Sequence, residues 1–219
     1  MNEAVKWLQD EAAQFLVKYE LKLKDVIIQP KEIEMYFFKK GVFEDNSVHR
    51  NELQQNNRNH FYIHRNGIKQ TDSYKGGNRP GLDFIVSDES FTFYSYLLRS
   101  AVVNGKMIIG PNKVLEAIKS ASRLSMQEIE ATPIEIISNA KSCPVLFSSR
   151  IHLGKSVLDN YRNYKLRAVA CDDSFRGAKY PGKEKMIVDF ILEKKWTGDQ
   201  AIEFAKEKLD YIPSILRQE

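Results

Sequence analysis

Hydrophobic residues recur at helical spacing near the N-terminus and gather in short runs after it. The first segment places apolar residues on one helical face, at Ala4, Val5, Leu8, Ala12, Phe15 and Leu16. This spacing predicts an amphipathic helix over about residues 3–19 that covers one side of the core. Val26–Ile28 and Ile33–Phe38 are rich in β-branched and aromatic residues, and the intervening Pro30 indicates two strands or one interrupted strand.

The middle of the chain alternates polar loops with apolar runs. Residues 41–57 are polar and predict a surface loop, which leads into a short strand over 60–64. The glycine-rich segment 66–81 is too long for a tight turn, so we expect a flexible flap. The runs 82–86 and 91–103 flank a Ser-Asp-Glu-Ser turn and predict an antiparallel hairpin.

The C-terminal half continues this mixture of strands and helices. Pro111 follows Gly110 and precedes helix formers, which predicts a helix beginning there. Further strands are expected at 134–137, 145–151 and 164–171, and two helices at 184–195 and 198–209, the second capped by Thr197. The pattern predicts an α+β fold, with a mixed, mainly antiparallel curved sheet and flanking helices. It contains no Rossmann, Walker A or kinase signature.

Composition narrows the class of protein. With 219 residues, 42% of them hydrophobic, the chain suits one globular domain. It has no apolar run long enough to cross a bilayer and no basic-then-apolar start, so we expect a cytoplasmic protein. Its two cysteines, Cys143 and Cys171, lie in no metal-binding motif and are interpreted as reduced packing residues. The net charge of +4 is compatible with binding to phosphate groups but does not by itself indicate such binding.

Polar residues inside apolar strand runs are the candidates for chemistry. Glu34, His64, Asp83 and Arg99 occupy such positions. Because an unpaired buried charge is costly, they indicate either an ion pair in a cleft or outward-facing positions on half-exposed strands. Aromatic and imidazole groups crowd the same segments. Flat rings of this kind stack on nucleobases, although most of the phenylalanines are expected to serve the core.

The order of several short motifs resembles the alkyladenine (3-methyladenine) DNA glycosylase family. The motifs are Glu32-Ile33-Glu34-Met35-Tyr36, His49, Phe61-Tyr62-Ile63, Leu82-Asp83-Phe84, Leu97-Leu98-Arg99-Ser100-Ala101, Gly110-Pro111-Asn112-Lys113-Val114, Ser149-Arg150-Ile151 and Tyr164-Lys165-Leu166-Arg167. The match covers about residues 10–170. The resemblance implies a glycosylase-like domain over 1–180, with residues 181–219 as a C-terminal helical extension packed on it.

The resemblance also implies roles for individual residues. Glu34 would activate the water that attacks the sugar C1′, and Arg99 would hold that carboxylate ionised and oriented. The base-binding residues would be Tyr36, His49, Tyr62 and Asp83. Contacts with the DNA backbone are expected from Arg50, Arg65, Lys113 and Arg150. The implied protein is a monomer that acts on damaged double-stranded DNA, with no metal, no organic cofactor, no catalytic lysine and no membrane partner.

Two departures from the family pattern bear on the substrate. The family's wedge tyrosine has no counterpart after Tyr62, where His64, Arg65 or the loop 66–81 would have to fill the gap left by a flipped base. Asp83 stands where the family has an asparagine that discriminates against guanine, and a carboxylate would accept a hydrogen bond from guanine's amine. Two alternatives stay open: a non-catalytic nucleic-acid-binding module of the same fold, and an N-glycosidase acting on free nucleosides or nucleotides.

Overall fold

Two long strands form the centre of the molecule. The computed structural model describes residues 2–77 and 80–217, in which β2 (Val26–Lys39) and β6 (Thr92–Val103) pair antiparallel. Most side chains on both strands are buried, because both faces of this part of the sheet are covered. This explains why the sequence shows near-continuous apolar runs here rather than a clean alternation.

The other strands extend the pair on both sides. They are β1 (Tyr19–Leu23), β3 (Phe43–Glu44), β4 (Phe61–Ile63), β5 (Leu82–Ile85), β7 (Lys106–Ile109), β8 (Glu135–Ser138), β9 (Val145–Ser148) and β10 (Arg167–Ala170). The main sheet order is β4-β5-β6-β2-β1-β8, and β10, which also pairs with β9, lies along β2. The pairings within the described residues are antiparallel, so the fold is α+β with a curled antiparallel sheet.

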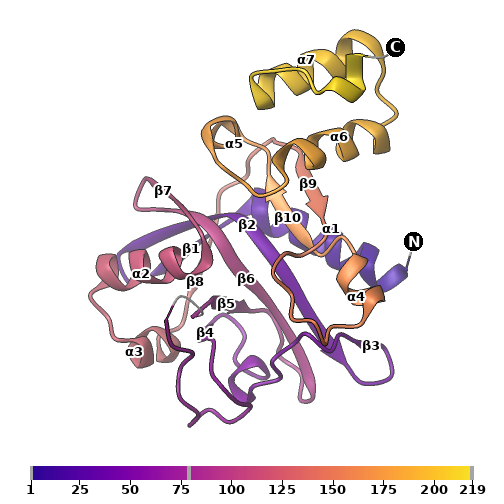
Figure 1. The fold of residues 1–219 in the computed structure, drawn as a ribbon. Helices are drawn as coiled ribbons and strands as arrows, with labels where there is room; N and C mark the ends of the chain where they lie inside the picture. The colour runs from indigo at the N-terminus through magenta and orange to yellow at the C-terminus, as the bar shows by residue number, and fades with distance from the viewer. Residues whose placement is uncertain (1, 78–79, 218–219) are drawn as a thin grey trace.

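Helices cover the sheet and add a separate layer at the C-terminal end (Figure 1). They are α1 (Glu3–Lys18), α2 (Pro111–Ser122), α3 (Met126–Ala131), α4 (Asp159–Asn163), α5 (Asp173–Gly177), α6 (Lys183–Glu193) and α7 (Gly198–Leu209), with 3₁₀ turns at Glu52–Gln54 and Ser214–Arg217. The helix α1 begins at the cap of Asn2, whose side chain accepts from the Ala4 and Val5 amides. Its apolar face, including Leu8 and Leu16, is buried in the main core.

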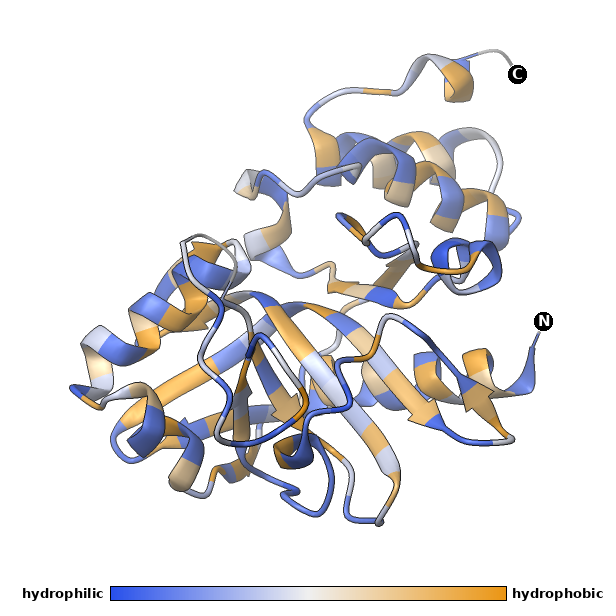
Figure 2. Ribbon diagram, turned by 60° about the horizontal axis from the view of Figure 1, so that its bottom comes forward, coloured by the Kyte–Doolittle hydropathy of each residue, from blue (hydrophilic) through white to orange (hydrophobic). Residues whose placement is uncertain are grey.

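The described residues form two hydrophobic clusters. The main core lies between the sheet and α1 on one side and α2 on the other. The second core joins α5, α6 and α7 to the outer faces of β9 and β10, through residues such as Val169, Phe175 and Ile187. In Figure 2 the strands are largely hydrophobic, whereas the long connections between β3 and β5 are mostly hydrophilic. Those connections surround the candidate site.

Several sequence-based expectations need correction. The predicted interruption around Pro30 is a local register shift within one continuous strand, β2. Thr197 stands at the start of α7, but its side chain makes no capping hydrogen bond. The strand expected over 145–151 ends at Ser148, so Arg150 lies in the following loop. The short helices α3, α4 and α5 and the strands β1 and β7 had no predicted counterpart. They are brief elements, for which periodicity gives little signal.

The described residues include no helix with the length and apolar character needed to cross a membrane.

Candidate active site

A β-bulge between the two central strands directs Arg99 toward the site. Glu32 lies opposite Ser100, whereas Ile33 lies opposite Leu98, so Arg99 is the extra residue between them. Bulges of this kind bend a strand and redirect the side chain of the inserted residue. The bulge therefore brings the Arg99 guanidinium close to the Glu32 and Glu34 carboxylates on β2, because Arg99 does not follow the regular alternation of side chains along β6.

Glu34 is fully buried and bonded at both carboxylate oxygens. Arg99 Nη1 lies 3.3 Å from Oε1, and the Ile151 backbone N–H donates to the same oxygen at 2.9 Å. The Tyr36 hydroxyl donates to Oε2 at 2.9 Å. Glu34 and Tyr36 are two residues apart on one strand and therefore share a face of the sheet. The structure thus brings together Glu34, Arg99 and Tyr36, with the Glu34 carboxylate bonded to both other side chains.

A second carboxylate completes this buried cluster. Glu32 Oε1 accepts from Arg99 Nε at 3.2 Å and from Arg167 Nε at 2.7 Å. Two guanidinium groups therefore face two carboxylates, which offsets the cost of burying each charge. No role was predicted for Glu32 or Arg167, although both lie in the segments that carry the family resemblance. Both residues lie among apolar residues, and a charge in such a position is the sequence feature that could have identified them, because a buried charge needs a partner.

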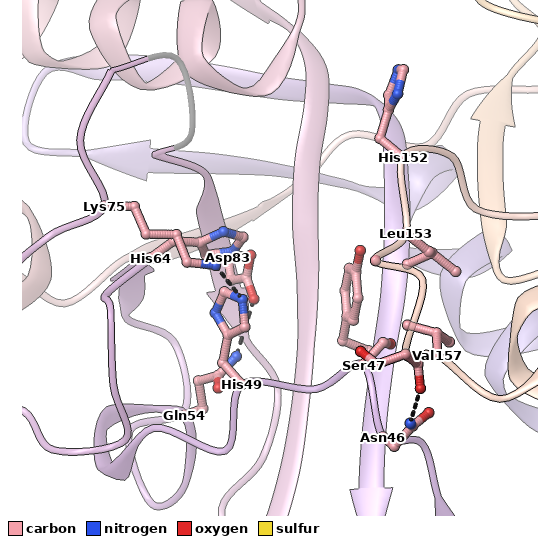
Figure 3. A pocket seen from close by; sticks show the side chains of 13 residues that line it. Asn46, Ser47, His49, Gln54, His64, Lys75, Asp83, His152, Leu153 and Val157 are labelled. Carbon is pink, nitrogen blue, oxygen red and sulfur yellow. Dashed lines mark hydrogen bonds and ion pairs between the residues drawn. The ribbon is translucent and has the colours of Figure 1, made fainter.

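A pocket of about 290 Å³ opens next to Tyr36. Figure 3 shows it between two groups of side chains, with His49, His64, Lys75 and Asp83 on one side and the 152–157 segment with Asn46 and Ser47 on the other. Among ligand pockets, which usually span about 300–1,000 Å³, it is small and suits a group the size of a base or a sugar. Glu34 does not line this pocket and contacts it through Tyr36.

His49 is held in one protonation state by its neighbours. Lys75 Nζ lies 2.7 Å from Nε2, which must accept, so Nδ1 carries the proton and faces the Tyr62 hydroxyl at 3.3 Å. Burial, with smaller electrostatic contributions from His64 and Lys75, lowers the pKa of His49 to about 3. The imidazole is therefore a neutral hydrogen-bond acceptor at physiological pH.

Asp83 is buried beside the pocket with its oxygens engaged. His64 Nε2 donates to Oδ1 at 2.7 Å, and Oδ2 accepts from Ser95 Oγ at 2.7 Å and Gln54 Nε2 at 3.2 Å. Burial opposes its ionisation, but His64 and these hydrogen bonds hold the pKa of Asp83 below its usual value. The predicted acceptor for a guanine amine is thus already occupied by protein donors. Its visible role is to orient His64.

Tyr62 and Tyr36 are less open to stacking than the sequence suggested. Tyr62 is fully buried and does not line the pocket; its hydroxyl contacts His49 and accepts from the Arg65 amide at 3.2 Å. Burial raises the pKa of Tyr62, so it stays a neutral phenol. Tyr36 lines the pocket, but the Arg150 guanidinium lies 4.7 Å from its ring centroid. Tyr62 therefore supports His49 rather than presenting a ring to a ligand.

The predicted backbone contacts divide into exposed and buried side chains. Arg50 and Lys113 are exposed, so each can reach a phosphate. Arg65 is buried against Glu130, and Arg150 donates to Asp45 Oδ2 at 2.6 Å with no side-chain exposure. Both ion pairs fix loops to the domain, so in this structure Arg65 and Arg150 are less accessible to a DNA phosphate than Arg50 and Lys113. The same burial makes Arg65 less accessible than an exposed side chain as the filler of the gap left by a flipped base.

Sequence reasoning missed much of the pocket wall. Gln54, Lys75 and the segment 152–157 line it, yet all lie in loops whose residues show no periodic pattern. The described residues contain no group of three or more His, Cys, Asp and Glu side chains suited to a metal ion. Both cysteines are free thiols, and burial raises the pKa of each.

Comparison of the chain with models of known protein families and with curated proteins gives no match.

Proposed function

We propose that the protein hydrolyses the N-glycosidic bond of a damaged purine nucleotide in DNA, as a glycosylase of base-excision repair. The observation that carries the proposal is the hydrogen bond between Tyr36 in the pocket wall and the buried Glu34, which Arg99 also contacts. A carboxylate near the sugar stabilises the positive charge that develops as the bond to the base breaks. The small pocket with imidazole and phenol groups suits a single extruded base or the sugar that carried it.

Because Glu34 has no exposed surface, its action on water passes through Tyr36. A water in the pocket transfers a proton to Tyr36 Oη while the phenol proton moves to Glu34 Oε2. The resulting hydroxide attacks C1′, and the electrons of the C1′–N bond leave with the purine. Burial, together with the Glu34 charge, raises the pKa of Tyr36 well above its usual value. Tyr36 therefore gains the proton from water as it gives its own proton to Glu34, and it does not persist as a phenolate.

Damaged duplexes test the proposal directly. Duplexes carrying hypoxanthine, ethenoadenine or 3-methyladenine are mixed with excess protein, and abasic sites are measured. Glu34→Gln is expected to abolish excision while DNA binding persists. The matched control is Glu32→Gln, which disturbs the same buried ion cluster but has no contact with Tyr36 among those described. It is expected to lower stability and retain excision below its melting temperature. Absence of abasic sites with folded, DNA-binding wild-type protein would refute the proposal.

A nucleoside N-glycosidase is the second candidate, and the burial of Arg65 and Arg150 favours it. These arginines would otherwise supply phosphate contacts on both sides of the site, and a free nucleoside needs none. Parallel reactions with the free nucleosides deoxyinosine and ethenodeoxyadenosine separate the candidates. Release of base from nucleosides but not from duplexes would replace the DNA substrate with a small one.

A further inference from the structure

Lys75 brings an amine into the pocket at a fixed position. Its backbone N–H donates to the His64 carbonyl at 2.9 Å, directly after the bridge between Arg65 and Tyr74. The side chain points toward His49, where Nζ lies 2.7 Å from Nε2 (Figure 3). Backbone and side chain are therefore both anchored, so the amine does not sample the wide range of an ordinary surface lysine.

The contacts around this amine hold its nitrogen beside a neutral imidazole ring. Lys75 contacts the acceptor nitrogen of His49, and Tyr62 contacts the other nitrogen of the same ring at 3.3 Å. An amine that a neighbouring ring holds in this way is positioned in advance to attack an electrophilic carbon. Because the pKa of His49 is about 3, the ring stays neutral throughout the physiological range. It therefore accepts the hydrogen bond from Lys75 Nζ and fixes the position of that amine without becoming protonated itself.

We propose that Lys75 forms a Schiff base with C1′ of a base-free deoxyribose held in the pocket. This inference rests on the proposed function only in taking the sugar left after base removal as the ligand. The amine first releases a proton to solvent, and its lone pair attacks the aldehyde form of C1′. The carbonyl oxygen takes up one proton from the attacking nitrogen and a second from solvent, and it leaves as water while the nitrogen lone pair forms the C=N bond of a protonated imine. No oxidant or reductant is needed, and Tyr36 lines the same pocket.

The experiment uses a duplex with a pre-formed abasic site and sodium cyanoborohydride, which reduces an imine to a stable amine. The full chain is expected to give a covalent protein–DNA adduct that peptide mass spectrometry maps to Lys75. Lys75→Arg keeps a positive donor for His49 but cannot form the imine, and it should lose the adduct. The matched control is Lys69→Arg, at an exposed lysine of the same loop, which should retain it. Thermal melting of each variant verifies that it is folded, and Lys75→Gln provides a second variant.

The two proposals fail separately. An adduct on abasic DNA without release of any damaged base would leave Lys75 as a sugar-binding nucleophile and refute the glycosylase. Base release without an adduct, or with an adduct that persists in Lys75→Arg and Lys75→Gln, would refute the role of Lys75 and leave the glycosylase standing. An adduct that maps only to other lysines would likewise refute the role of Lys75.

Discussion

At the scale of single residues, the candidate site depends on which side chains are held charged and which are held neutral. Glu34 and Arg99 share one buried cluster with Glu32 and Arg167. His49 lines the same pocket as Tyr36 and is kept neutral mainly by burial. The pocket thus combines a carboxylate reached through a phenol with an imidazole that only accepts hydrogen bonds.

The lowered pKa of His49 predicts a specific dependence of stability on pH. Between about pH 6.5 and 3 the unfolded chain binds a proton at His49 that the folded chain does not, so acidification favours unfolding. Replacing His49 with Gln removes this contribution and should flatten the slope by at most about 1.4 kcal/mol per pH unit. Urea unfolding at several pH values measures it. An unchanged slope in His49→Gln would contradict the prediction.

At the scale of secondary-structure elements, the close approach of neighbouring segments sets the geometry of the site. The bulge at Arg99 aims one side chain from β6 at β2. On the other side of the pocket, the chain entering β5 passes so close to His64 that only a glycine fits at position 81. A Cβ at Gly81 would lie 2.7 Å from His64 Cε1 and 2.9 Å from Leu97 Cδ1. Position 81 therefore controls where the His64 ring stands against Asp83.

Gly81→Ala is expected to destabilise the fold by about 1–3 kcal/mol through overpacking. It should also displace His64 from Asp83 and reduce any activity of the pocket by more than the loss of stability explains. Chemical denaturation and the base-excision assay measure the two effects. Gly76→Ala is the matched control, because its added methyl group would meet no atom within 4 Å. Equal behaviour of the two variants would show that the space around Gly81 adjusts freely.

At the scale of the whole molecule, β9 and β10 connect the two hydrophobic cores. Ala168 and Ala170 belong to the main core, whereas Val169 between them belongs to the cluster with α5, α6 and α7. Because successive side chains of a strand point to opposite faces, one face of β10 packs in the main core and the other packs in the second core. We expect the C-terminal helices to unfold together with the sheet.

Substitution of Ile187, which is fully buried in α6, tests this coupling. Ile187→Ala should cost about 2–5 kcal/mol, while Leu192→Ala, at an exposed position of the same helix, should stay within about 0.5 kcal/mol. The two tryptophans report separately, since Trp7 contacts Phe37 near the main core and Trp196 packs on α6 and α7. Single-tryptophan variants should show coincident transitions that Ile187→Ala shifts together. Separate transitions would mean that the two cores fold independently.

The sequence by itself determined the main elements and the core of the candidate site. Helical periodicity predicted α1, Pro111 with the helix formers after it predicted α2, and β-branched and aromatic runs predicted the long strands, because each of these features is local in the sequence. Glu34 and Arg99 stood out because charges inside apolar strands require partners. Even so, the pattern could not show that Tyr36 lies between Glu34 and the pocket.

Tertiary structure alone decided which charges face inward and which loops meet. Arg150 bonds to Asp45 across 105 residues of sequence, and nothing local in either segment predicts that choice. The same holds for Lys75, whose contact with His49 joins two loops without periodicity. An ion pair or a pocket wall arises from side-chain packing between distant segments, whereas hydrophobic spacing reports only how one segment meets the core. The sequence therefore indicated the Glu34 carboxylate, whereas only the fold showed that the Lys75 amine lines the neighbouring pocket.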